Sequence, residues 1–193
     1  MKPGPVMNAG TLRFMLAAAL CFLMISSQGS GKAAATVPEP EGFRLNQYRS
    51  DVPATLKGAR TVSSDEAKTL HDAHQTLFID VLPRPPKPSN LPKGTVWRDM
   101  RRDSISGSFW LPNVGYGRLH ATVAAYFKAQ LARLTGGDRS KAVLFFCLER
   151  CWMSWNAAKR ALEYGYTNVI WYSEGSDGWT AAGHALERIE PEK

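Results

Sequence analysis

The sequence predicts an α/β fold, with a central, mostly parallel β-sheet of about five strands and helices on both faces. Three observations carry this prediction. Residues 142–146 (AVLFF) and 168–172 (NVIWY) are apolar runs of strand length. The segment between them has apolar residues at helical spacing and ends at Gly165. A strand, a helix and a second buried strand make a βαβ unit, and such units build parallel sheets.

The elements that precede this unit alternate in the same way. A capping-box pattern at Ser63 and Glu66 predicts the start of a helix. Residues 77–81 (LFIDV) predict a buried strand, and residues 105–113 predict a turn followed by a short strand. Apolar spacing over residues 118–134 predicts a second helix, which two glycines end.

Two further segments have no periodic pattern. Residues 36–60 contain three prolines and predict an extended N-terminal arm that lies across the domain. Residues 82–104 contain five prolines, so they predict a long loop rather than regular structure. Long loops inside a compact domain are often functional. The predicted domain itself covers residues 61–193, and it includes this loop.

Residues 1–35 have the layout of a secretory signal peptide. Lys2 and Arg13 precede an apolar run over residues 14–25, and no acidic residue is present. That run has twelve residues, whereas about 20 are needed to span a bilayer. We expect cleavage after Ala35, export to the periplasm and no stable membrane span afterwards. An uncleaved membrane anchor is the alternative.

The net charge does not indicate binding to nucleic acids or to anionic membranes, although the chain is basic. The formal charge of the chain is +7, and three of these charges lie in the predicted signal peptide, which leaves +4. This value argues for solubility, and no nucleic-acid partner is expected. With 44% hydrophobic and 21% charged residues, the chain can form a packed core.

Two of the three cysteines lie in the predicted mature protein, at Cys147 and Cys151. Cys147 follows an apolar strand and precedes a helix, where backbone N–H groups and the helix N-terminus lower the pKa of a thiol. We predict that Cys147 is the reactive thiolate, Cys151 a resolving thiol and Arg150 an assisting group. An inert, buried cysteine is the alternative for Cys147, and a packing role is the alternative for Cys151.

The connection after Cys147 is predicted to bind an anion such as a persulfide. Ser154 is predicted to cap the following helix. Trp152 and Trp155 are predicted to form an apolar lip for a partner or ligand, with ordinary packing as the alternative. The predicted anion-binding loop consists of Leu148, Glu149, Arg150, Cys151, Trp152 and Met153. No cofactor or metal is predicted, because the chain has no Walker loop, dinucleotide glycine pattern or haem-attachment motif.

The segment from Ala142 to Trp179 resembles the C-terminal half of a rhodanese domain. The resemblance rests on the cysteine at the strand end, the Gly-Tyr-x-Asn-Val turn and the closing tryptophan. Residues 78–81 also resemble the IDVR strand of that family, and the whole match covers residues 61–186. It implies a rhodanese-like fold with chemistry at Cys147. Sulfurtransferases of the family carry an arginine directly after the cysteine, whereas this chain has Leu148.

More narrowly, the stretches CLERCWMSWNAAKRAL and GYTNVIWYSEGSDGW resemble the exported CxxCW-motif proteins associated with pyrroloquinoline-quinone (PQQ)-dependent catabolism. This resemblance implies a quinoprotein dehydrogenase or a c-type cytochrome as partner.

Two functions are therefore open. One is a thiol enzyme, either a sulfurtransferase or a thiol-disulfide oxidoreductase, acting on a small sulfur donor or thiol substrate. The other is a non-catalytic accessory module that binds the quinoprotein or cytochrome. Phosphatase activity is disfavoured, because Met153 stands where related phosphatases need an arginine.

Overall fold

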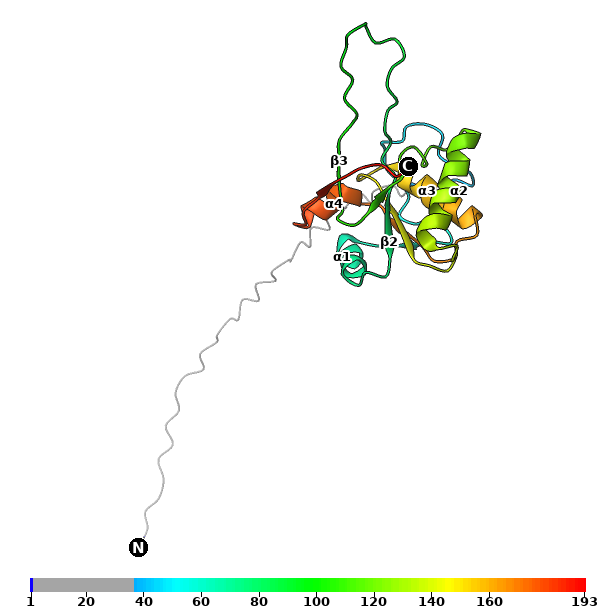
Figure 1. Ribbon diagram of the computed structural model, residues 1–193. Coiled ribbons are helices and arrows are strands. Elements are labelled where there is room, and N and C mark those ends of the chain that lie inside the picture. The colour runs from blue at the N-terminus through cyan, green and yellow to red at the C-terminus, as the bar shows by residue number, and fades with distance from the viewer. Residues whose placement is uncertain (2–36) are drawn as a thin grey trace, which may run out of the picture. The chain divides into compact units, whose positions relative to one another are not determined.

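The computed structural model describes Met1 and residues 37–193 of the protein (Figure 1). The predicted signal peptide, with its cleavage site at Ala35, lies outside the described residues. Within the described part of the chain, no helix combines the length and apolar character needed to cross a bilayer.

Five parallel strands form the central sheet, in the order β1-β6-β5-β2-β4. Their bounds are β1 Arg60–Thr61, β2 Leu77–Asp80, β4 Phe109–Trp110, β5 Val143–Phe146 and β6 Val169–Tyr172. Every neighbouring pair runs parallel. The predicted fold class is confirmed, because crossover helices connect most of these strands.

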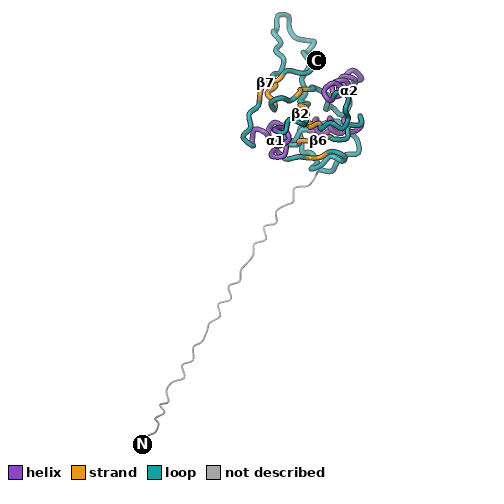
Figure 2. The backbone as a smooth tube through the Cα atoms, turned by 60° about the horizontal axis from the view of Figure 1, so that its bottom comes forward, coloured by secondary structure: helices purple, strands orange, loops and turns teal. Residues whose placement is uncertain are grey.

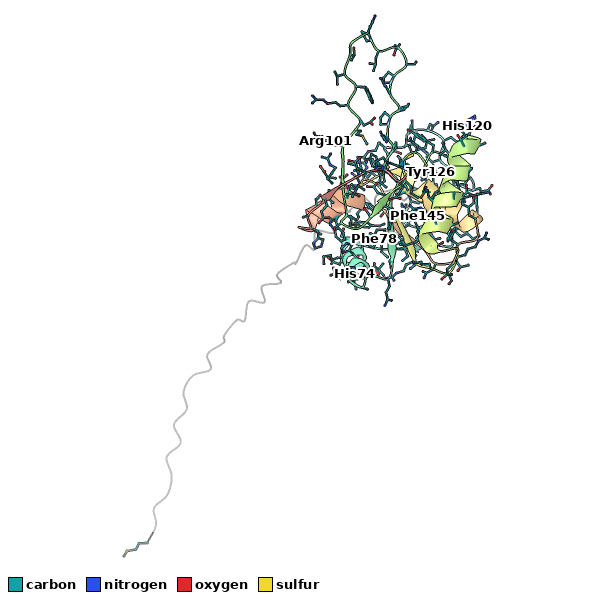
Figure 3. All side chains as sticks on the ribbon, in the orientation of Figure 1. His74, Phe78, Arg101, His120, Tyr126 and Phe145 are labelled. Carbon is teal, nitrogen blue, oxygen red and sulfur yellow. The ribbon has the colours of Figure 1, made fainter. Side chains whose placement is uncertain are left out.

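The helices cover both faces of the sheet, as predicted (Figure 1). Helices α2 (Ala121–Thr135) and α3 (Trp152–Glu163) pack on one face, and α1 (Ser64–Asp72) and α4 (Gly175–Ala181) pack on the other. Successive residues of a strand point to opposite faces, so Phe145 joins the first core and Phe146 the second. Figure 3 labels one residue of each core, Phe145 and Phe78.

Local sequence signals were sufficient for most of the main elements. Ser63 caps α1, and Glu66 completes the capping box. Helix α2 ends at Gly136, whose φ of +66° suits glycine. The sequence did not predict α4 or the two-stranded antiparallel sheet of β3 (Arg102–Ser104) and β7 (Glu187–Ile189). These elements are too short to show a period.

Helix α3 begins two residues before the predicted capping residue, Ser154. Cys151 is the N-cap residue, and the backbone N–H of Trp152 donates to the carbonyl of Tyr48 at 2.9 Å. Ser154 is buried in the first turn, where its hydroxyl donates to the Cys151 carbonyl at 3.1 Å. The acceptor that extends the helix comes from a distant segment, so local sequence could not reveal it.

The two irregular segments lie differently. The N-terminal arm (residues 37–59) packs on the domain: Leu56 is buried, whereas Leu45 is exposed. The Pro-rich loop (residues 82–101) connects β2 to β3 and projects away from the body of the domain (Figures 1 and 2). Residues 82–101 form no helix or strand.

Candidate functional site: a buried pair of thiols

Cys147 and Cys151 meet at the carboxyl end of the sheet. Cys147 is the first residue after β5, and Cys151 is the N-cap residue of α3. Their Sγ atoms are 2.7 Å apart and both cysteines are free. Both are buried, with exposed fractions of 0% for Cys147 and 2% for Cys151. The strand-loop-helix connection therefore holds a reduced dithiol within reach of a disulfide bond of about 2.0 Å.

The two thiols differ in acidity. Burial raises the pKa of Cys147 well above its ordinary value, and the adjacent Cys151 and the Asp80 carboxylate raise it further. The pKa of Cys151 is lowered to about 7, chiefly by a hydrogen bond from the Cys147 thiol. Backbone N–H groups of Met153 and Leu148 and the charge of Arg49 add to this lowering, against burial, which raises the pKa. The proton shared by the pair therefore stays on Cys147.

This distribution differs from the sequence-based expectation that Cys147 carries the reactive thiolate. The reason is that Cys147 is fully buried at the strand end, and burial without solvent contact disfavours its charged thiolate form. Cys151 has the helix N-terminus beside it, and the positive end of a helix dipole stabilises a thiolate.

The backbone of Cys147 is fixed from α4. The N–H and the hydroxyl of Ser176 both donate to the Cys147 carbonyl, at 3.0 and 3.2 Å. Gly175 has a φ of +58°, and a Cβ at this position would lie 2.6 Å from the same carbonyl oxygen. The close approach of α4 to the cysteine therefore requires glycine.

A buried charge network lies behind the cysteine. Arg102 donates to the Asp80 carboxylate through Nε at 2.5 Å and to the Ser176 hydroxyl at 3.0 Å. Ser104 also donates to this carboxylate at 2.5 Å. Burial raises the pKa of Asp80, while Arg102 and Ser104 act to lower it. The Asp80 carboxylate also accepts from the Leu82 N–H at 2.9 Å, and it thereby holds the backbone at the start of the Pro-rich loop.

The N-terminal arm covers the thiols. Arg49 pairs with Cys151 in an antiparallel β-bridge, and its guanidinium donates to the Glu149 carbonyl at 2.8 Å. The neighbouring Tyr48 carbonyl accepts the first N–H of α3. The arm thus occupies a backbone donor that an anion at the helix N-terminus would use.

The arm also encloses the tryptophans of α3. The indole N–H of Trp152 donates to the Asp51 carbonyl at 3.0 Å, and that of Trp155 donates to the Thr55 carbonyl at 3.2 Å. Their exposed fractions are 1% and 0%. Trp152 and Trp155 therefore do not form the predicted apolar lip, and the alternative of ordinary packing describes them, since both are buried and the arm accepts their indole N–H groups.

Arg150 does not face the thiols as its predicted assisting role requires. Its φ is +52°, and its guanidinium pairs with Asp51 of the arm at 2.8 Å, with the Arg150 side chain 60% exposed. The positive charge beside Cys151 comes instead from Arg49.

The predicted anion-binding loop is shorter than expected. Trp152 and Met153 belong to the first turn of α3, which leaves Leu148, Glu149 and Arg150 between the cysteines. The N–H of Glu149 already donates to the Asp177 carboxylate at 3.1 Å. The N–H of Trp152 likewise donates to the Tyr48 carbonyl of the arm. The connection therefore provides fewer free N–H groups for an anion than we expected from the sequence.

Three contributors to the site were missed by sequence reasoning: Arg49, Arg102 and Ser176. Each lies far from the cysteines along the chain and in a segment without a periodic pattern. Of the three, only Ser176 lies within the segment 142–179 that carries the rhodanese resemblance.

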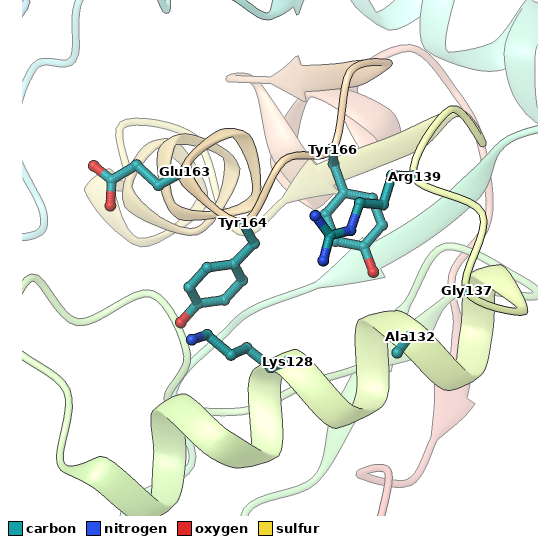
Figure 4. Close-up of a pocket in the computed structure, with 7 residues that line it drawn as sticks. All are labelled: Lys128, Ala132, Gly137, Arg139, Glu163, Tyr164 and Tyr166. Atoms are coloured by element: carbon teal, nitrogen blue, oxygen red, sulfur yellow. The ribbon is translucent and has the colours of Figure 1, made fainter.

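A separate pocket of about 500 Å³ lies at the far end of α3 (Figure 4). Lys128 lies over the ring of Tyr164, and Arg139 and Tyr166 also line the pocket. The twelve residues of α3 span about 18 Å, so this pocket and the dithiol cannot bind one small substrate together. Among the described residues, no three His, Cys, Asp or Glu side chains gather to hold a metal ion.

Comparisons with known proteins give structural similarities only. No protein-family model matches the chain. No curated protein matches it either. The solved structures that resemble it include a thiosulfate sulfurtransferase from Pseudomonas aeruginosa, with 20% identity and a TM-score of 0.46 over 69% of this chain. The chain spans about a fifth (21%) of that sulfurtransferase.

Two further similar structures are closer to this chain in length. A polysulfide-sulfur transferase from Wolinella succinogenes is 19% identical with a TM-score of 0.41, over 67% of this chain and 78% of its own. A Rhodopseudomonas palustris protein of unknown function, described as a candidate tyrosine phosphatase, is 18% identical with a TM-score of 0.44, over 70% and 99%. Similarities at these values transfer no activity to this chain.

Proposed function

We propose that the protein is a rhodanese-like thiol protein whose Cys147 and Cys151 act as a dithiol-disulfide pair. The observation that carries the proposal is the 2.7 Å separation of the two Sγ atoms, together with the lowered pKa of Cys151. A thiol that is partly ionised near neutral pH and has a second thiol in contact is suited to disulfide exchange.

The exchange proceeds in two steps. The Cys151 thiolate attacks one sulfur of a substrate disulfide, and the leaving sulfur departs with the electron pair and takes up a proton from water. Cys147 then loses its proton and attacks Sγ of Cys151 in the mixed disulfide, which releases the second substrate thiol. The protein gives up two electrons and the Cys147 proton, water supplies the second proton, the substrate disulfide is reduced to two thiols, and a Cys147–Cys151 disulfide forms.

Sulfur transfer is the competing reaction of the same site. A persulfide on either cysteine would need N–H donors around its terminal sulfur. The N–H of Glu149 is bonded to Asp177 and that of Trp152 to Tyr48. These two bonds favour disulfide exchange over a stable persulfide.

The setting of this activity follows from the sequence resemblance. The signal-peptide pattern of residues 1–35 supports a periplasmic location. The resemblance of residues 147–162 to the CxxCW-motif proteins supports a link to PQQ-dependent alcohol catabolism, although three residues separate the cysteines in this chain. In this proposal the substrate belongs to, or accompanies, a quinoprotein dehydrogenase or c-type cytochrome. A purely accessory role remains the alternative, although the buried tryptophans no longer offer its binding surface.

The test compares two donors by the intact mass of the purified protein. Glutathione disulfide should convert the wild type to a form that lacks two hydrogens, and it should trap a glutathione adduct on the Cys147→Ser variant. The Cys151→Ser variant should form little adduct, because the pKa of Cys147 is raised. Gain of one sulfur atom from thiosulfate would instead establish sulfur transfer, and no product with either donor would contradict thiol chemistry.

A further inference from the structure

We propose that the Pro-rich loop (residues 82–101) is a docking element for an acidic protein surface, and that it brings this partner to the dithiol. The docking part stands on the charge and the position of the loop. The statement that the docked protein exchanges disulfides with Cys147 and Cys151 rests on the proposed function.

The loop carries the entire net charge of residues 37–193. These residues contain 21 Lys and Arg and 17 Asp and Glu, a net charge of +4. The loop contains five basic residues and one acidic residue, also a net charge of +4, so the remainder of the described domain is neutral. The basic residues are Arg84, Lys87, Lys93, Arg98 and Arg101. The +4 that suggested only solubility is therefore concentrated in 20 residues.

Most of these charges are available to a partner. Arg84 pairs with Asp99, the one acidic residue of the loop. Within residues 37–193, the other four basic side chains form no ion pair. All four residues are exposed, and Figure 3 shows Arg101 at the base of the loop. Unpaired charges of one sign on a projecting segment attract a surface of opposite charge and accelerate encounter.

Both ends of the loop adjoin the thiol site. The loop begins beyond β2, where Asp80 lies in register with Phe146, the residue before Cys147. It ends at Arg102, whose guanidinium bonds to Ser176, and Ser176 holds the Cys147 carbonyl. A protein docked on the loop would therefore sit at the carboxyl end of the sheet, where the thiols lie.

The side chains of the loop favour a protein surface over a lipid surface. Its outer part has turns at Ser89-Asn90 and Lys93-Gly94, which are polar and provide no apolar wedge for a bilayer. Val96 is 78% exposed on the returning limb, beside the half-buried Trp97. A mixture of basic, aromatic and exposed aliphatic side chains on a proline-stiffened segment suits a protein interface.

The test uses a defined probe, a fluorescent Glu-rich peptide closed by an internal disulfide, and a Gln-rich peptide of equal length. Binding is measured by anisotropy with the Cys147→Ser/Cys151→Ser protein, so that no exchange occurs. The loop variant carries Lys87→Gln, Lys93→Gln, Arg98→Gln and Arg101→Gln. The matched control makes the same charge change elsewhere, with Lys57→Gln, Arg118→Gln, Lys128→Gln and Lys141→Gln.

We expect the Glu-rich peptide to bind about tenfold or more tightly than the Gln-rich peptide at low salt. The loop variant should lose this preference and the control variant should keep it. Equal losses in both variants, or equal binding of both peptides, would overturn the proposal. Loop-dependent binding to phosphatidylglycerol vesicles without peptide binding would overturn it in favour of a membrane.

A final arm of the experiment separates docking from chemistry. With both cysteines present, the rate of peptide disulfide reduction is compared between the loop variant and the control variant. Peptide binding without any reduction would contradict the proposed function and leave docking intact. Reduction that is equally fast in both variants would contradict docking and leave the proposed function intact.

Discussion

The N-terminal arm and the Pro-rich loop are both irregular and both contain several prolines, yet the structure uses them in opposite ways. The arm bonds to α3 along its length, from Arg44 to Thr55. The loop projects from the domain and bonds to it near its start, through Leu82 and Arg84. Proline content alone therefore does not decide whether a segment packs.

The difference lies in what the domain offers to each backbone. Helix α3 presents polar side chains that match the arm: Asn156 accepts from the Arg44 N–H and donates to its carbonyl, both at 2.9 Å. The indoles of Trp152 and Trp155 add two more donors. The outer part of the loop contacts no matching surface of the domain. Its unpaired charges are more favourably solvated in water than they would be if they packed against the domain. The arm restricts access to the thiols, and the loop is free to recruit a partner.

The largest effect is expected when the arm is released. Asn156→Ala should remove both bonds to Arg44 and a third bond to the Gly115 carbonyl, since all three use this buried side chain. We expect the free energy of unfolding to fall by about 2–3 kcal/mol. Alkylation of Cys151 in the folded protein should become faster, because an arm that is no longer anchored by Asn156 covers this thiol less of the time.

Asp51→Asn is the matched control for Asn156→Ala. It breaks only the ion pair between Asp51 and Arg150, which is largely exposed, and such pairs contribute little to stability. Denaturant titration and timed alkylation with mass spectrometry measure both variants. An unchanged alkylation rate in Asn156→Ala would show that the arm does not control access to the thiols.

A smaller effect is expected on the acidity of Cys151. Its pKa is lowered to about 7, so its thiolate should be lost as the pH falls through this value. Arg49→Gln in the arm should shift the midpoint upwards, since the charge of Arg49 contributes to the lowering. Lys87→Gln in the loop should leave it unchanged. Thiolate absorbance measured against pH gives the titration midpoint of each variant. Equal shifts in Arg49→Gln and Lys87→Gln would show that the arm does not influence Cys151 more than the loop does.

The smallest effect on stability is expected for the loop. Replacing residues 86–98 by a short Gly-Ser linker should change the free energy of unfolding by less than about 1 kcal/mol, because loop closure depends weakly on length. The rate of alkylation of the thiols by a small reagent should also stay the same. Chemical denaturation of the shortened protein checks this, and a large loss of stability would show that the loop packs as the arm does.

The sequence predicted those parts of the molecule that local patterns determine. The apolar runs at residues 142–146 and 168–172, the capping box of α1 and the glycine end of α2 all correspond to observed elements. The proximity of Cys147 and Cys151 was also predictable, because only three residues separate them in the connection between a strand and a helix.

Long-range contacts account for what the sequence could not show. The start of α3 depends on Tyr48, and the acidity of Cys151 depends in part on Arg49, about 100 residues away. Burial of Trp152 and Trp155 follows from the same segment. The arm was expected to lie across the domain, but a sequence without periodicity did not indicate where.

The most direct test of the central claim is equilibration of the protein in glutathione buffers of graded redox poise, followed by alkylation and intact mass. We expect one cooperative two-electron transition, from a form in which Cys147 and Cys151 are both alkylated to a form in which neither is alkylated and no glutathione is bound. The single variants Cys147→Ser and Cys151→Ser should lack this transition. A wild-type protein that keeps two alkylatable thiols throughout, or that accumulates a stable glutathione adduct, would contradict a Cys147–Cys151 redox pair.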